Sequence, residues 1–140
     1  MPQLTSKRLE MCRRLIASRK IVGDRLGYGM CSSPILDMLL ELFVATHEGR
    51  PAYSWSLCMF AHVPISTALR KMEAMEQEGM VIREKACRDR RRIQVYLTPE
   101  GRSAVEGLLD RLAQIYAAEP LTASTPAEAG PLLARPALTS

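Results

Sequence analysis

The stretch from Ser54 to Thr98 changes its hydrophobic period from that of a helix to that of a strand, and this change constrains the fold more than any other feature of the chain. Before Gly79, apolar residues recur three and four positions apart, as on one side of an amphipathic helix. After Gly79, apolar and polar residues alternate, as in half-buried strands. The pattern predicts two helices followed by a β-hairpin.

The two predicted helices are separated at Val63-Pro64, because the residue before a proline avoids the helical region and proline cannot continue the hydrogen-bond ladder. Ser54 is the expected N-cap of the first helix, and Gly79 is expected to end the second. Two helices joined by so short a turn suit a helix-turn-helix whose second helix enters the major groove of DNA. The first helix has one apolar face, formed by Trp55, Leu57, Cys58 and Ala61, with Trp55 expected to be half-buried. The residues of the second helix that are expected to face a core are Ile65, Ala68, Leu69, Met72 and Met75.

The predicted hairpin carries a concentrated positive charge at its tip. Between Arg83 and Arg92 lie six basic and two acidic residues, so this segment alone has a net charge of +4, equal to that of the whole chain. Such a density repels itself unless an anion lies opposite, and arginine side chains commonly enter a narrow minor groove. The hairpin tip is therefore expected to contact DNA rather than to be a merely solvated loop.

Together these features resemble the MarR family of winged-helix transcriptional regulators. The family's wing carries Asp-x-Arg, followed by Leu-Thr and a helix start that bears a glycine, and these match Asp89-Arg90-Arg91 and the segment 97–101. The family's step out of the recognition helix resembles the segment 75–81. The likeness covers about Leu57 to Leu109. His62 departs from it, because the family usually has glycine in this turn.

The resemblance implies which side chains of the second helix meet DNA. Ser66, Thr67 and Arg70 match the recognition-helix residues of the family. Thr67 could touch a thymine methyl group, and Arg70 could either read a guanine or clamp a phosphate; Lys71 is expected to touch phosphate. The alternative for all four is a solvated helix face.

The resemblance also implies roles for the residues of the wing. Arg91 would enter the minor groove, and Asp89 would pair with a nearby arginine and hold the tip in shape. The remaining arginines of the wing are expected to contribute to DNA binding through charge-assisted bonds to phosphate: Arg88, Arg90 and Arg92.

The whole chain is expected to be mainly α with a small β-hairpin, in one MarR-like domain over residues 1–119. The winged-helix core spans about 52–98, and apolar stripes over about 4–26 and 99–118 exceed what that core needs. By the resemblance these flanking helices form a homodimer, which would bind a pseudo-palindromic DNA site. The helix after Pro34 is apolar on nearly all sides and is expected to be the most buried. Residues 120–140 hold four prolines and no period, which is typical of a flexible tail.

Several classes of protein are not favoured by the composition. No apolar run approaches the length of a membrane span, and the start of the chain lacks the apolar core of a signal peptide, so a cytoplasmic protein is expected. No hydrolase, nucleotide-binding or metal-ligand motif is present in the sequence, which predicts a non-enzyme without cofactor or metal. A sequence pI of about 9.1 fits a nucleic-acid partner.

Two alternatives and one extension remain open. Cys87 lies beside Lys85 and Arg88, which would lower its pKa, and Cys12 lies near the N-terminus, where some members of the family have a reactive cysteine; a redox-sensing regulator is therefore one alternative. The other alternative is a winged helix that binds a protein partner. By the resemblance, a small-molecule effector could release the protein from DNA.

Overall fold

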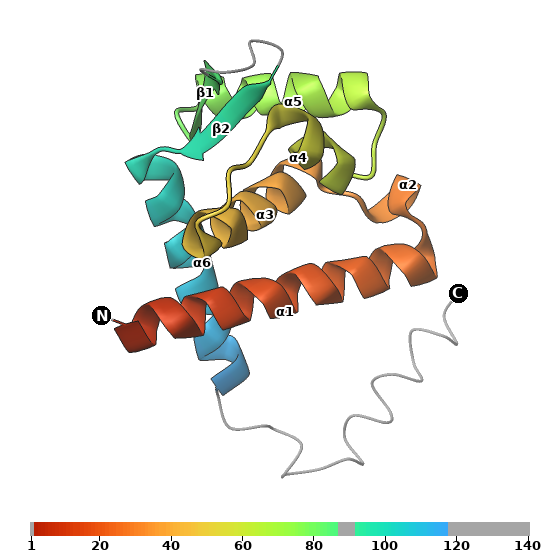
Figure 1. Cartoon of the computed structure of the whole chain (residues 1–140). Helices are drawn as coiled ribbons and strands as arrows, with labels where there is room; N and C mark the ends of the chain where they lie inside the picture. The colour runs from red at the N-terminus through yellow and green to blue at the C-terminus, as the bar shows by residue number, and fades with distance from the viewer. Residues whose placement is uncertain (1, 87–91, 118–140) are drawn as a thin grey trace.

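A computed structural model describes residues 2–86 and 92–117 of the chain. Figure 1 shows α5 and the hairpin at one end of the molecule and α1 at the opposite end, with α3 between them. The mainly α fold with a small hairpin is confirmed, whereas the wing tip and the tail at 120–140 lie outside the described residues. The elements are α1 (Pro2–Leu26), α2 (Tyr28–Cys31), α3 (Pro34–Glu48), α4 (Ser54–Phe60), α5 (Ile65–Gln77), β1 (Val81–Lys85), β2 (Ile93–Leu97) and α6 (Pro99–Ala117).

The helix α3 forms the centre of the core, because its sequence leaves few polar positions that could face water. It packs against α1, α4, α5, β2 and α6. This burial confirms that α3 is the most buried helix in the described part of the chain. Its seven buried residues are Met38, Leu39, Leu40, Leu42, Phe43, Val44 and Ala45.

The start of α4 differs from the prediction that Ser54 caps it. Tyr53 is the N-cap, with an extended backbone, and Ser54 is the first residue of the helix. The reason is that the chain before α4 pairs with the hairpin: the Val95 N–H donates to the Ala52 carbonyl at 2.8 Å, and Tyr53 forms a β-bridge with Gln94. The segment before α4 thus pairs with the outer edge of β2 through an isolated β-bridge, beside the two-stranded sheet.

Two apolar residues, Trp55 and Leu69, are more exposed than the sequence predicts. In α4, Leu57 and Cys58 are buried, but Trp55 is 64% exposed. In α5, Leu69 is 40% exposed. The helical period was correct, but the buried stripe of α5 is narrower than predicted, because it consists of Ala68, Met72 and Met75 alone.

The connections on both sides of the hairpin are fixed by backbone contacts. Gly79 ends α5 with a φ of 77°, which favours glycine. Thr98, the N-cap of α6, is buried; its hydroxyl donates to the Gly79 carbonyl at 2.5 Å and accepts the Gly101 N–H at 2.9 Å. The end of α5, the hairpin and the start of α6 are therefore held as one unit.

The helices α1 and α6 cross at the other end of the molecule (Figure 1). Arg8 donates to both carboxylate oxygens of Asp110, at 2.9 and 2.8 Å, and also pairs with Glu106 at 3.4 Å.

None of the helices in the described ranges combines the length and the apolar composition that a membrane span requires. Between α1 and α3 the chain forms the short helix α2.

Candidate nucleic-acid interface

The outer face of α5 carries the polar residues that the sequence singles out. Residues four apart lie on the same side of a helix. Ser66 and Arg70 form one exposed row, which continues to Glu73. Thr67 and Lys71 form the next row, with Thr67 half-buried and Lys71 exposed. The four predicted contacts therefore lie on two neighbouring rows, and Ser66 and Arg70 point most directly away from the core.

The hairpin that follows α5 is antiparallel, with Val81 opposite Leu97 and Lys85 opposite Ile93. The Ala86 N–H donates to the carbonyl of Arg92 at 2.8 Å, and the guanidinium of Arg92 lies over the ring of Tyr53, 5.1 Å from its centroid. Arg92 thus lies at the base of the wing. The other predicted wing residues lie outside the described residues: Cys87, Arg88, Asp89, Arg90 and Arg91.

Arg83 belongs to a structural ion pair and not to the exposed charge of the wing. Its guanidinium donates to Glu76 Oε1 at 3.0 and 2.8 Å, and its backbone N–H donates to Glu76 Oε2 at 3.3 Å. The hydrogen bonds from Arg83 lower the pKa of Glu76. This pair ties the end of α5 to β1, so α5 and the hairpin are held at a fixed angle. Sequence periods could not predict the pair, because they do not show which side chains of different elements meet.

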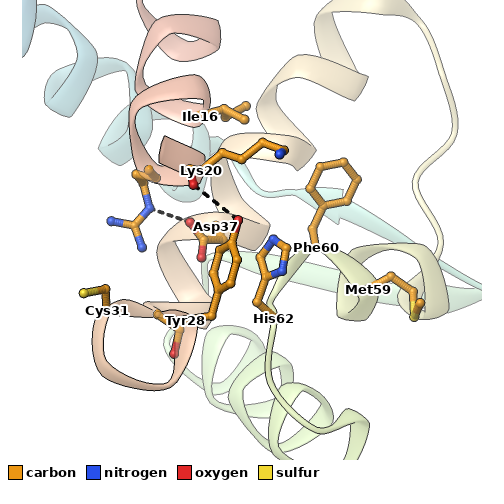
Figure 2. Close-up of a pocket in the computed structure, with 10 residues that line it drawn as sticks. Ile16, Lys20, Tyr28, Cys31, Asp37, Met59, Phe60 and His62 are labelled. Carbon is orange, nitrogen blue, oxygen red and sulfur yellow. Dashed lines mark hydrogen bonds and ion pairs between the residues drawn. The ribbon is translucent and has the colours of Figure 1, made fainter. Parts of the chain in front are cut away.

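A cavity of about 270 Å³ lies between α1, α2, the start of α3 and the end of α4. Figure 2 shows Ile16 and Lys20 on one side and Phe60 and His62 on the other. Arg19 and Asp37 both line the cavity, and Arg19 Nε donates to Asp37 Oδ1 at 2.5 Å. The cavity thus adjoins the turn between α4 and α5 through Phe60 and His62.

His62, where the sequence departs from the family pattern, adopts a backbone conformation that is usual for glycine. It has a φ of 54°, the left-handed conformation that glycine adopts easily, so the turn keeps the geometry of a glycine turn with a histidine in it. Its ring stacks on Tyr28, with centroids 4.0 Å apart (Figure 2). The Tyr28 hydroxyl donates to Asp24 at 2.7 Å and lies 3.3 Å from the Lys20 carbonyl. The hydrogen bond to Asp24 raises the pKa of Tyr28 and lowers that of Asp24. This chain of contacts joins α1 to the turn before α5, and sequence spacing could not have revealed it.

Cys12 has an environment that disfavours a thiolate. It is fully buried, and its thiol donates to the Leu40 carbonyl at 3.4 Å. Burial, with a smaller contribution from the charge of Glu41, raises the pKa of Cys12 to about 12. The structure therefore lends no support to Cys12 as an oxidant sensor. In the described ranges, no three His, Cys, Asp or Glu side chains lie close enough together to hold a metal ion.

Comparisons with known proteins identify the fold. No family model matches the sequence, and no curated protein matches it. A crystal structure of the S. aureus MepR–DNA complex superposes with a TM-score of 0.56 at 17% identity, covering 88% of this chain and 95% of that one. The structure of AF1382 from Archaeoglobus fulgidus superposes with a TM-score of 0.52 at 17% identity, covering 61% and 90%. The predicted likeness to MarR-type winged-helix proteins is confirmed at the level of the fold.

Proposed function

We propose that this protein is a sequence-specific, DNA-binding transcriptional regulator that acts as a homodimer. Each subunit inserts α5 into a major groove and the wing at residues 87–91 into the flanking minor groove. The observation that carries this proposal is the exposed row of Ser66 and Arg70 on α5, beside a hairpin that the Glu76–Arg83 pair holds at a fixed angle. A fixed angle matters because the helix and the wing must fit two adjacent grooves at once.

The homodimer is supported by apolar surface that a single chain leaves uncovered. Large apolar side chains along α1 and α6 are exposed, at the end of the molecule away from α5 (Figure 1). Ile21 of α1 and Tyr116 of α6 line one hollow, so apolar surface is continuous between the two helices there, and contiguous apolar surface commonly marks an interface. In such a dimer α1 and α6 set the distance between the two copies of α5. The DNA site is therefore expected to be pseudo-palindromic, with half-sites about one helical turn apart. The side chains are Leu4, Ile21, Val22, Leu26, Leu108, Ile115 and Tyr116.

Release by a small ligand is supported by the position of the cavity at the α4–α5 turn. A molecule that entered it would press on Tyr28 or His62, and any shift of this stack would move the base of α5. A ligand can change DNA affinity only by binding one arrangement better than the other.

The test is DNA binding measured by fluorescence anisotropy at two salt concentrations. The probes are a labelled duplex from upstream of the protein's own coding sequence and a scrambled duplex of the same length. Wild type is expected to prefer the upstream duplex and to bind less tightly as salt increases. Arg70→Ala and Arg91→Ala are each expected to weaken binding about tenfold, and Arg91→Ala to reduce the salt slope by about 1.

Arg50→Ala provides the matched control, because Arg50 is an exposed arginine in the connection between α3 and α4, outside α5, the wing and the proposed dimer helices. It should leave affinity unchanged. No duplex binding at low salt would contradict the proposal and favour a winged helix that binds protein. Equal losses in all three variants would mean that only net charge matters. Analytical ultracentrifugation should give a mass of two chains.

A further inference from the structure

A groove beside the contacts proposed for α5 and residues 87–91 runs between the start of α4, α5 and β2. Trp55, the only tryptophan in the chain, forms part of its wall and is 64% exposed. Leu69, which was expected in the core, lines the side of α5, and Ile93 lines the side of β2. The groove has a volume of about 560 Å³ and also includes Tyr53 and Arg92.

The position of this groove is defined by the two elements that flank it. On one side lies α5, which we expect in the major groove, and on the other lies the hairpin, which we expect in the minor groove. In B-DNA a major groove and the adjacent minor groove are separated by one sugar–phosphate strand. A molecule that enters both grooves from one side must pass this strand across the surface between its two insertions. Here that surface is the groove that holds Trp55.

We propose that this groove seats the sugar–phosphate strand of DNA, with the Trp55 indole against a deoxyribose and its Nε1–H donating to a phosphate oxygen. This inference rests on the proposed function and adds a contact residue that the sequence did not single out. Indole is a donor only, so an anionic acceptor suits it. Its ring also offers an apolar face to the sugar.

The charge around the groove fits a polyanion better than a protein or a second copy of the chain. Arg92 contributes a cation at the wall, held over the Tyr53 ring. Among the described residues that line the groove, none carries a carboxylate. Arg70 follows Leu69 directly on α5, so the groove is continuous with the proposed recognition surface. The apolar surface available to a second copy lies instead on α1 and α6.

The intrinsic fluorescence of Trp55 tests the proposal directly, because no other tryptophan contributes. The full-length protein is titrated with the upstream duplex while tryptophan emission, its quenching by acrylamide and the anisotropy of the labelled duplex are followed. We expect emission to change and acrylamide access to fall, with the same midpoint as the anisotropy. Trp55→Phe, which keeps an aromatic ring and loses the donor, is expected to weaken binding about fivefold.

The salt dependence separates this contact from those of the arginines. Trp55→Phe removes no charge, so its salt slope should equal that of wild type, whereas Arg91→Ala should reduce the slope by about 1. Because Trp55 is largely exposed, far-UV circular dichroism and Tm should not change in the variant.

Each other outcome refutes a different statement. Duplex binding by anisotropy with unchanged emission and acrylamide access would overturn the assignment of the groove and leave the proposed function intact. Shielding of Trp55 that depends on protein concentration without DNA would mean that a second copy covers the groove. Absence of any duplex binding would overturn the proposed function itself, and the groove assignment with it.

Discussion

Alanine substitutions at two glycines of α6 test how closely this helix is docked against the end of α5. Both changes add one methyl group to the same helix. At Gly101 the added Cβ would lie 2.0 Å from the carbonyl oxygen of Met80, whereas at Gly107 no atom of the described chain lies within 4 Å. We therefore expect the two variants to change the free energy of unfolding in opposite directions.

The magnitudes follow from these distances. Gly107 lies in the interior of the helix, where alanine is favoured by about 0.5–1 kcal/mol. At Gly101 the Met80 carbonyl must move by about 1 Å to restore the 3.0 Å that real contacts keep. This carbonyl also accepts the Thr98 N–H at 3.0 Å, so the bond weakens as it moves. Overpacking costs about 1–3 kcal/mol and the weakened bond about 1 kcal/mol, which together make about 2–4 kcal/mol. The helix preference for alanine offsets part of this, so a net loss of about 1–3 kcal/mol is expected.

Urea unfolding followed by far-UV circular dichroism measures both values, and thermal melts check them. The variants are expected to differ in Tm by about 10 °C, at about 3–5 °C per kcal/mol for a domain of this size. If Gly101→Ala is as stable as wild type, α6 does not approach Met80 as closely as described. If Gly107→Ala is equally destabilised, glycine in α6 has a role that contacts within one chain do not explain.

Two further predictions concern ionisation. Arg8 lowers the pKa of Asp110, so the pair should stabilise the fold at a pH above the ordinary aspartate value and lose this effect as acid protonates Asp110; Asp110→Asn should cost about 0.5–1 kcal/mol near neutral pH and progressively less as the pH falls below the ordinary aspartate pKa, as measured by urea unfolding across pH. Cys12 is buried and has a pKa of about 12, so it should stay unmodified when the folded protein is treated with maleimide at neutral pH. It should react once urea unfolds the protein. Mass mapping that finds Cys12 modified before unfolding would contradict its burial.

Much of the fold could be predicted because its signals are local. The change of period at Gly79, the break at Pro64 and the Leu97-Thr98 motif each depend on neighbours within a few positions of the chain. The structure bears out the helix-turn-helix, the hairpin and the buried α3. The prediction erred at Trp55, because periodicity gives the direction of a side chain on its helix and not which neighbour covers it.

The sequence by itself therefore determined the order of helices and strands, the concentration of positive charge on one hairpin and the polar row on α5. Only the tertiary structure decided that Glu76 holds Arg83, that Tyr28 stacks on His62 and that Leu69 faces an open groove. The physical reason is distance along the chain. A local period is imposed by backbone geometry and by neighbours three or four residues away, whereas these contacts arise only when separate elements pack around α3.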